Sequence, residues 1–148
     1  MDEYHNEEYD LIEHDDYWLI PLRGTRVAKI IIDLALRIEF IDASENETMI
    51  WIGGSIRIRS QGNEYMLHGD NPKELAPILE LWGSAVDSAA AHKDGRLEVK
   101  FRDGSDFCAY PLPATESWGV TGQRWLRIVC MPGGDLAVWK PDPVSNKQ

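Results

Sequence analysis

The hydrophobic pattern after residue 17 is typical of β-strands. Leu36, Ile38 and Phe40 alternate with Arg37 and Glu39, and this two-residue period indicates a strand with one buried face. Similar apolar faces, bounded by turn residues such as Asp-Gly, recur along the rest of the chain. We therefore expect further strands within the ranges 50–52, 56–58, 64–68, 97–101, 106–110, 124–130 and 135–139.

One helix is predicted between two sets of strands. Asn71 can cap its start, Pro72 suits its first position, and apolar residues then recur at helical spacing as far as a natural stop at Gly83. Pro77 argues against a regular helix, because an interior proline removes a hydrogen bond. We expect about three helical turns over residues 72–82.

Two segments of the chain resemble one another. Residues 27–40 and 86–101 both end in an alternating strand that closes on phenylalanine, and an aspartate follows each at Asp42 and Asp103. Any two amphipathic hairpins share such a pattern, so coincidence is the alternative to duplication. Duplication would make 85–92 a strand, although its alanines could instead extend the helix. The predicted fold is α+β: an antiparallel β-rich sandwich or open barrel of two meander-like halves, with one covering helix.

Negative charge is concentrated at the start of the chain. The net charge is −10, and residues 1–16 contain eight of the 25 acidic residues and no Lys or Arg. A segment this acidic buries too little apolar surface to offset its ordering entropy. We expect an acidic, mobile arm over residues 1–17, a single β-rich domain over 18–140 and a frayed tail over 141–148. The arm is either a solubilising tail or a segment that docks on a basic partner.

Several classes of function lack the residues that they need. The chain contains no G-x-G-x-x-G, Walker, H-E-x-x-H, C-x-x-C or G-x-S-x-G motif, so we predict no cofactor, no metal and no catalytic residue. Without clustered Lys and Arg, nucleic acid and anionic membranes are poor partners. The first twenty residues have no signal-peptide pattern, which favours a cytoplasmic location with Cys108 and Cys130 reduced and buried.

Aromatic and charged residues provide the candidate binding site. The chain has six tryptophans, and Trp51 and Trp125 fall opposite the apolar faces of their predicted strands. Outward aromatics beside arginine are typical of binding surfaces, although loops and the helix could cover them as core. Arg37, Arg57 and Arg59 could line up across strands as an anion or carboxylate clamp. They could equally pair with Glu39, Glu64 and other surface acids. The candidate partner-binding residues are Asp10, Glu13, Asp15, Asp16, Trp18, Trp51, Arg57, Arg59, Glu116 and Trp118.

Short motifs along the chain resemble a known family. They are Leu22-Arg23-Gly24, Ala76-Pro77-Ile78-Leu79, Gly95-Arg96-Leu97-Glu98-Val99-Lys100-Phe101, Glu116-Ser117-Trp118 and Pro132-Gly133-Gly134-Asp135-Leu136-Ala137-Val138-Trp139. From about residue 18 to 140 the chain is similar to an uncharacterised, mainly actinobacterial family, domain of unknown function 6188. The resemblance implies no activity, cofactor or catalytic residue, and it places 85–92 as a strand.

These observations lead to one principal hypothesis of function and two alternatives. The first is a non-enzymatic cytoplasmic protein-interaction module, such as an immunity-type inhibitor of a basic protein, in which charge speeds encounter and aromatic rings supply affinity. The second is a small-ligand-binding or enzymatic β-barrel with a pocket built from Arg57, Arg59, His68 and Glu116. The third is a homo-oligomer formed through an exposed strand edge.

Overall fold

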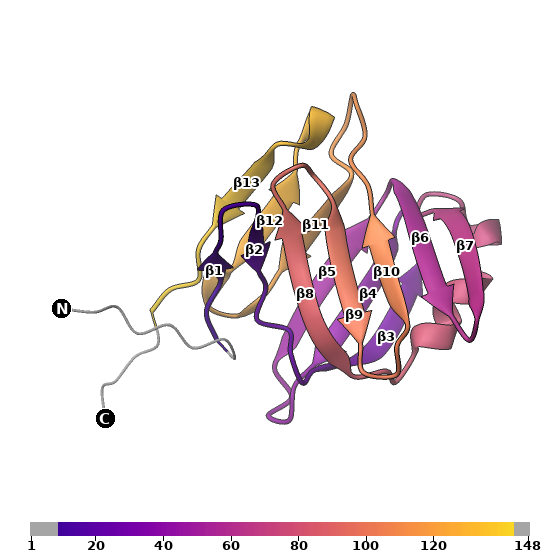
Figure 1. The fold of residues 1–148 in the computed structure, drawn as a ribbon, viewed down its shortest axis with the longest axis horizontal. Coiled ribbons are helices and arrows are strands. Elements are labelled where there is room, and N and C mark those ends of the chain that lie inside the picture. The colour runs from indigo at the N-terminus through magenta and orange to yellow at the C-terminus, as the bar shows by residue number, and fades with distance from the viewer. Residues whose placement is uncertain (1–8, 144–148) are drawn as a thin grey trace.

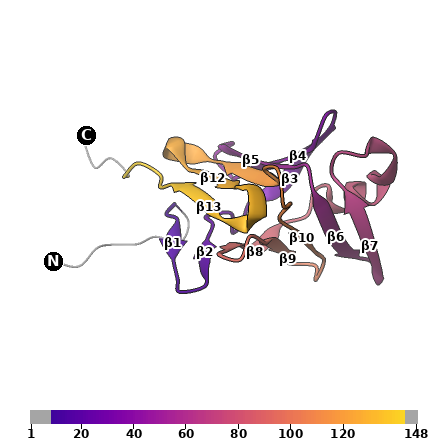
Figure 2. The ribbon, with the colours of Figure 1, turned by 90° about the horizontal axis from the view of Figure 1, so that it is seen from above.

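Two antiparallel sheets pack face to face in the computed structural model, which describes residues 9–143 (Figures 1 and 2). The seven-stranded sheet has the order β1 (Ile12–Glu13), β2 (Tyr17–Leu19), β8 (Val86–His92), β9 (Leu97–Phe101), β10 (Asp106–Ala109), β6 (Ser55–Ser60) and β7 (Asn63–His68). The six-stranded sheet has the order β13 (Leu136–Trp139), β12 (Arg127–Cys130), β11 (Trp118–Thr121), β5 (Glu47–Ile52), β4 (Leu36–Ile41) and β3 (Arg26–Ile32). The prediction of an antiparallel β-sandwich is confirmed.

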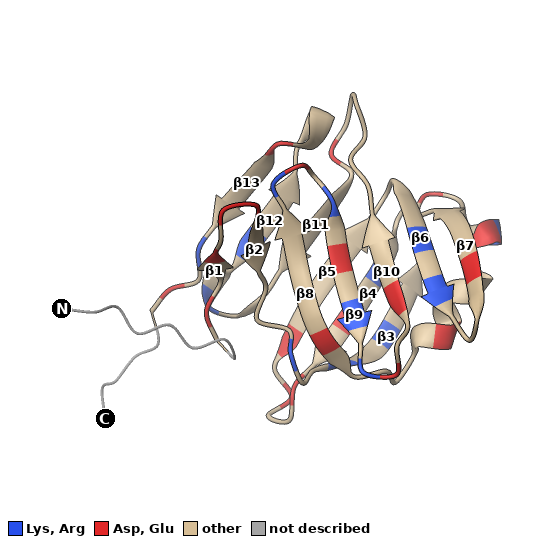
Figure 3. Cartoon of the chain, viewed as in Figure 1, with Lys and Arg blue, Asp and Glu red and all other residues tan. Residues whose placement is uncertain are grey.

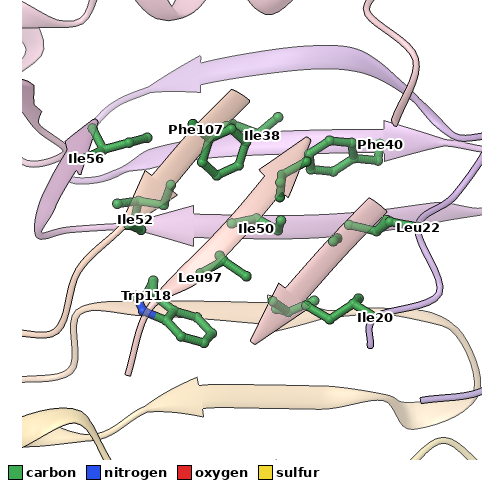
Figure 4. Packing of buried hydrophobic residues seen from close by; sticks show 14 of the residues in the cluster. Ile20, Leu22, Ile38, Phe40, Ile50, Ile52, Ile56, Leu97, Phe107 and Trp118 are labelled. Atoms are coloured by element: carbon green, nitrogen blue, oxygen red, sulfur yellow. The ribbon is translucent and has the colours of Figure 1, made fainter. Parts of the chain in front are cut away.

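The core lies between the two sheets and follows the alternation of the sequence. In β4, Leu36, Ile38 and Phe40 are buried while the residues between them are partly exposed. From the opposite sheet, Phe107 of β10 lies beside Ile38, and Leu97 of β9 lies beside Ile50 of β5 (Figure 4). The two-residue period places every second side chain in this apolar layer, and its removal from water is the main force that holds the sheets together.

The covering helical segment is present, but the prediction of a single helix of about three turns is wrong. The chain forms two consecutive 3₁₀ helices, η1 (Pro72–Glu74) and η2 (Ala76–Leu81), beside β7 (Figure 1). Asn71 caps η1 by accepting a hydrogen bond from the backbone N–H of Lys73 at 3.3 Å. Pro77 has no N–H to donate, so a continuous α-helix through this segment would lose a hydrogen bond.

The remaining strands form two halves that share one topology. Strands β3, β4 and β5 form a meander in the six-stranded sheet before the chain crosses to the other sheet as β6 and β7. Strands β8, β9 and β10 form a meander in the seven-stranded sheet before the chain crosses back as β11 and β12. The halves therefore interlock, because β5 pairs with β11 and β10 pairs with β6. Segment 86–92 is strand β8, as the internal comparison predicted.

Local details repeat between the two halves as well. A β-bulge follows Val27 in β3 and another follows Val86 in β8, and these valines pair with Phe40 and Phe101 respectively. The two segments also bond to each other reciprocally: the N–H of Val27 donates to Ser84 O at 3.0 Å, and the N–H of Val86 donates to Thr25 O at 2.8 Å. The two halves thus repeat the same bulge and the same pairing at Val27 and Val86.

The structure describes only the inner parts of the predicted arm and tail. Residues 1–8 and 144–148 lie outside the described residues, so the prediction of a mobile arm is untouched there. Residues 141–143 have no regular secondary structure, yet the backbone N–H of Asp142 donates to Arg124 O at 2.6 Å.

Residues 9–17, expected to belong to the arm, lie instead against the sandwich. Strand β1 pairs with β2, which pairs with β8, and this extends the seven-stranded sheet. Leu11 is buried and joins the core with Trp18. The ammonium group of Lys93 binds the carboxylate of Glu13 at 2.6 Å, which offsets part of the local negative charge. The burial of Leu11 and the ion pair between Glu13 and Lys93 therefore hold this acidic segment against the sandwich.

Candidate functional site

The predicted acidic contacts lie around the β1–β2 hairpin. Asp10 forms an ion pair with Arg124 at 3.5 Å, and Glu13 forms one with Lys93. The hydrogen bond from Lys93 is the largest cause that lowers the pKa of Glu13. Asp15 and Asp16 are exposed in the turn. The hairpin therefore presents a fixed acidic edge.

Two of the predicted tryptophan contacts face inward. Trp118 is completely buried, and its indole N–H donates to Gly95 O at 2.9 Å. Trp18 is also buried, with the ammonium groups of Lys93 and Lys140 5.7 and 5.8 Å from its ring centre. Neither indole is available to a partner on the folded surface. Trp118 begins β11, and its side chain points inward.

Trp51 does lie on the outer face of its sheet, where it is half-buried. Its partner residue on β11 is Gly119, and the indole occupies the space above that glycine. A Cβ atom at Gly119 would lie 2.2 Å from the Trp51 Nε1 atom, so no larger residue fits without moving the ring. The indole covers the sheet and presents only part of its surface to solvent.

The two arginines lie on the outer face of the seven-stranded sheet and pair with acids. Arg57 and Arg59 each approach Asp106 at 4.0 Å, and Arg59 binds Glu64 at 3.1 Å. Blue and red segments alternate across β9, β10 and β6 in Figure 3. The arrangement is the surface charge pairing that was the alternative to an anion clamp.

The pocket expected from Arg57, Arg59, His68 and Glu116 is not assembled. His68 pairs with Glu74 at 3.1 Å, and Glu116 is exposed in the loop between β10 and β11. A hollow of about 670 Å³ does border Arg59, but none of the other three residues lines it. Its lining residues are Arg59, Ser60, Gln61, Gly62, Asn63, Glu64, Glu80, Asp103, Gly104 and Ser105.

The clearest surface feature is a turn that the candidate list missed. Strands β11 and β12 are joined by a turn in which the N–H of Leu126 donates to Gln123 O at 3.1 Å. Its central residues, Arg124 and Trp125, have φ angles of 55° and 70°, in the left-handed region. Each non-glycine residue in that region costs about 1–2 kcal/mol. The turn displays the Trp125 side chain with 81% of its surface exposed.

Arg124 joins this turn to both ends of the described chain. Its guanidinium donates hydrogen bonds to the carbonyl oxygens of Tyr9 and Asp142 and pairs with Asp10. The contacts bring the half-exposed Tyr9 close to the turn.

Trp139 adds a third aromatic side chain to the same region. Its residue pairs with Arg127 across β12 and β13, and the guanidinium lies 5.2 Å from the ring centre. Half of the Trp139 side chain is exposed. We call the surface formed by Tyr9, Trp125 and Trp139 the aromatic end.

One signal in the sequence pointed to part of this surface. Trp125 falls opposite the apolar face of its predicted strand, which indicates an outward indole. The left-handed turn and the bonds from Arg124 join residues far apart in the chain, and no local pattern reveals them.

The thiols show no sign of activation. Cys108 and Cys130 are buried and free, and burial is the largest influence on both and raises the pKa of each thiol. Such thiols stay protonated at neutral pH, and the thiolate is the reactive form. Within residues 9–143, no three His, Cys, Asp or Glu side chains are grouped as ligands for a metal ion.

Comparison with known proteins identifies a family. The sequence profile of a family of unknown function, DUF6188, matches residues 18–140. The chain belongs to DUF6188. The DUF6188 match includes Trp125 and Trp139 and begins after the acidic segment that precedes residue 18. No curated protein and no solved structure matches the chain. None of the helices among the described residues is long and apolar enough to span a membrane.

Proposed function

We propose that this DUF6188 protein is a non-enzymatic protein-interaction module, which binds a partner through its aromatic end. The observation that carries the proposal is Trp125, a bulky residue held in a left-handed turn with its indole exposed. Strained backbone persists where the surrounding structure maintains it, and it is concentrated at functional sites. Tryptophan, tyrosine and arginine are also the residues that dominate the binding energy of protein interfaces.

The chemistry of the partner follows from charge. The net charge is −10, and Asp15 and Asp16 lie exposed in the β1–β2 turn on the side of the sandwich where β13 also lies (Figure 1). Long-range attraction would speed the encounter with a basic protein, and aromatic contacts would then hold it. An immunity-type inhibitor of a basic toxin or enzyme in the cytoplasm fits both parts, because inhibition needs tight binding and no chemistry from the inhibitor.

The test begins with capture of partners from the organism that encodes the protein. The full-length wild type and the double variant Trp125→Ala/Trp139→Ala are used as baits in parallel. A protein captured by the wild type alone is then purified and titrated by calorimetry. We expect the double variant to bind at least roughly thirtyfold more weakly, which is the loss typical of one hot-spot residue. Raising the salt concentration should slow association more than it speeds dissociation.

The matched control removes an exposed apolar side chain elsewhere. Leu79 is 55% exposed on η2, near β7 and away from the aromatic end, so Leu79→Ala should bind like the wild type. Equal affinity of the wild type and the double variant for the purified partner would refute the proposed surface. If the partner is a toxin or an enzyme, its activity should fall in proportion to the complex formed.

A further inference from the structure

The six-stranded sheet has a free edge at β3, and it is unusually apolar. Strand β3 ends with three consecutive isoleucines, Ile30 to Ile32, and pairs with β4 on one side only. Ile32 is 38% exposed and Leu34, in the following turn, is 94% exposed. An exposed apolar edge presents main-chain donors and acceptors that readily pair with another strand.

The fold covers only the first part of this edge. The Trp82 indole N–H donates to Ala28 O at 3.1 Å. The backbone N–H of Gly83 donates to Val27 O, and the N–H of Val27 donates to Ser84 O. Among the described residues, no segment pairs with 29–32 on the side away from β4. The part of the β3 edge that is open to pairing is therefore short and begins at residue 29. We call residues 29–32 the open stretch.

Other edges of the sandwich are less suited to pairing. Strand β1 has two residues and carries Glu13. Strand β7 carries exposed polar residues at Asn63, Glu64 and His68, and β13 is followed closely by Pro141. Such short, charged or proline-flanked edges are the ones that natural proteins protect from pairing.

We infer that β3 is a self-association site at which a second copy of this chain adds its own β3 in antiparallel orientation. A two-fold axis perpendicular to the sheet keeps inward residues opposite inward residues. Ile30 and Ile32 are inward, because they pair with the core residues Ile38 and Leu36 of β4. In the register that uses the open stretch, Ile30 therefore faces Ile32 of the second copy.

The same register makes the charges complementary. It places Ile31 on the two-fold axis, opposite Ile31 of the second copy, and it places Lys29 opposite Asp33 of the second copy. Lys29 and Asp33 are exposed, and within one chain they pair with Glu39 and Arg37 respectively. Association would thus place each Lys29–Glu39 pair beside an Asp33–Arg37 pair of the second copy. The interface would then contain two rows of four charges, and the charges in each row would alternate in sign. Opposite charges directly across two strands stabilise their pairing, and like charges oppose it.

The complementarity provides a test with two charge-reversed variants of the full-length protein. Sedimentation equilibrium should show that the wild type is in monomer–dimer exchange at micromolar concentrations, because a short edge buries little area. Lys29→Asp and Asp33→Lys should each weaken dimerisation about tenfold or more, since each creates two like-charge pairs. An equimolar mixture of the two variants should recover the wild-type affinity as a heterodimer, because every facing pair is again opposite in charge.

Controls separate this result from unfolding and from other contacts. Lys100→Asp makes the same charge change on the other sheet, where Lys100 is exposed, and should leave dimerisation unchanged. If a charge variant does not melt cooperatively, Ile31→Lys is used in its place. This substitution puts two lysines opposite each other at the two-fold axis, so it should also weaken dimerisation. A wild type that stays monomeric, variants that dimerise normally, a mixture that does not recover, or growth beyond a dimer would each overturn the inference.

Discussion

The β6–β7 and β11–β12 hairpins occupy corresponding places in the two halves, but their turns differ. In β6–β7 the left-handed positions are Gln61 and Gly62, with φ angles of 54° and 80°. In β11–β12 they are Arg124 and Trp125. Glycine adopts this conformation without steric cost, whereas tryptophan does not. The β11–β12 turn is therefore less stable locally at the position where it exposes an indole, as expected if that indole binds a partner.

The central strands show a second difference within the common frame. Gly119 of β11 pairs with Trp51, and Arg57 of β6 pairs with Cys108 at the corresponding place. The large side chain comes from the last strand of the meander, β5, in one case and from the crossing strand, β6, in the other. Each sheet thus pairs one large residue with a small one on its outer face, and in both sheets the large residue comes from the first half of the chain.

The largest effect on this comparison is expected from Gly119→Ala. The new Cβ atom would lie 2.2 Å from the Trp51 Nε1 atom, so the indole must move off the sheet. We expect the free energy of unfolding to fall by about 1–3 kcal/mol, as for other overpacked sites. Arg57→Ala at the corresponding position should cost less than about 1 kcal/mol, because it removes a partly exposed ion pair and adds no clash. Urea denaturation measures both free energies of unfolding, and equal losses would contradict the difference between the two sheets.

Exchanging the turn residues should produce a smaller effect of opposite sign in the two hairpins. Gly62 has a φ of 80° and open space around its Cβ position, so Gly62→Trp tests the backbone conformation alone. We expect it to destabilise the protein by about 1 kcal/mol. Trp125→Gly should raise the melting temperature by about 2–4 °C and at the same time weaken partner binding by about thirtyfold. A Trp125→Gly protein that is less stable than the wild type would show that the turn is not strained.

The smallest effect concerns the aspartate that follows the alternating strand in each half. The Ser105 hydroxyl, followed by its backbone N–H, lowers the pKa of Asp103 by hydrogen bonding to its carboxylate. Burial opposes the corresponding shift at Asp42, but hydrogen bonds from Asn46 and Ser44 still lower its pKa.

Both carboxylates should therefore stabilise the fold above the pKa of an unfolded aspartate, about 4. The contribution is lost as the pH falls from there through the lower pKa of the folded state. Stability measured by denaturant titration between neutral pH and about pH 3 should fall less in Asp103→Asn and in Asp42→Asn than in the wild type. An unchanged pH dependence in both variants would show that these turns do not hold the carboxylates in their charged form.

Much of the architecture follows from local pattern. Alternation such as that of Leu36, Ile38 and Phe40 predicts a strand and its buried face, because successive side chains of a strand point to opposite sides. The likeness of residues 27–40 and 86–101 predicted that 85–92 is a strand, which β8 confirms. The helix type was harder to predict, because caps and apolar spacing favour a helix while Pro77 disfavours its α form.

Which surfaces are presented to other molecules was decided by the tertiary structure. Composition alone does not distinguish the six tryptophans, yet Trp118 is completely buried and Trp125 is 81% exposed. The acidic segment 9–17 is held by Leu11 in the core and by Lys93, contacts between residues far apart in the chain. Local sequence determines which residues alternate, since that depends on neighbouring dihedral angles. Whether a side chain is buried or exposed depends on which distant strand packs against it, and only the folded chain brings those strands together.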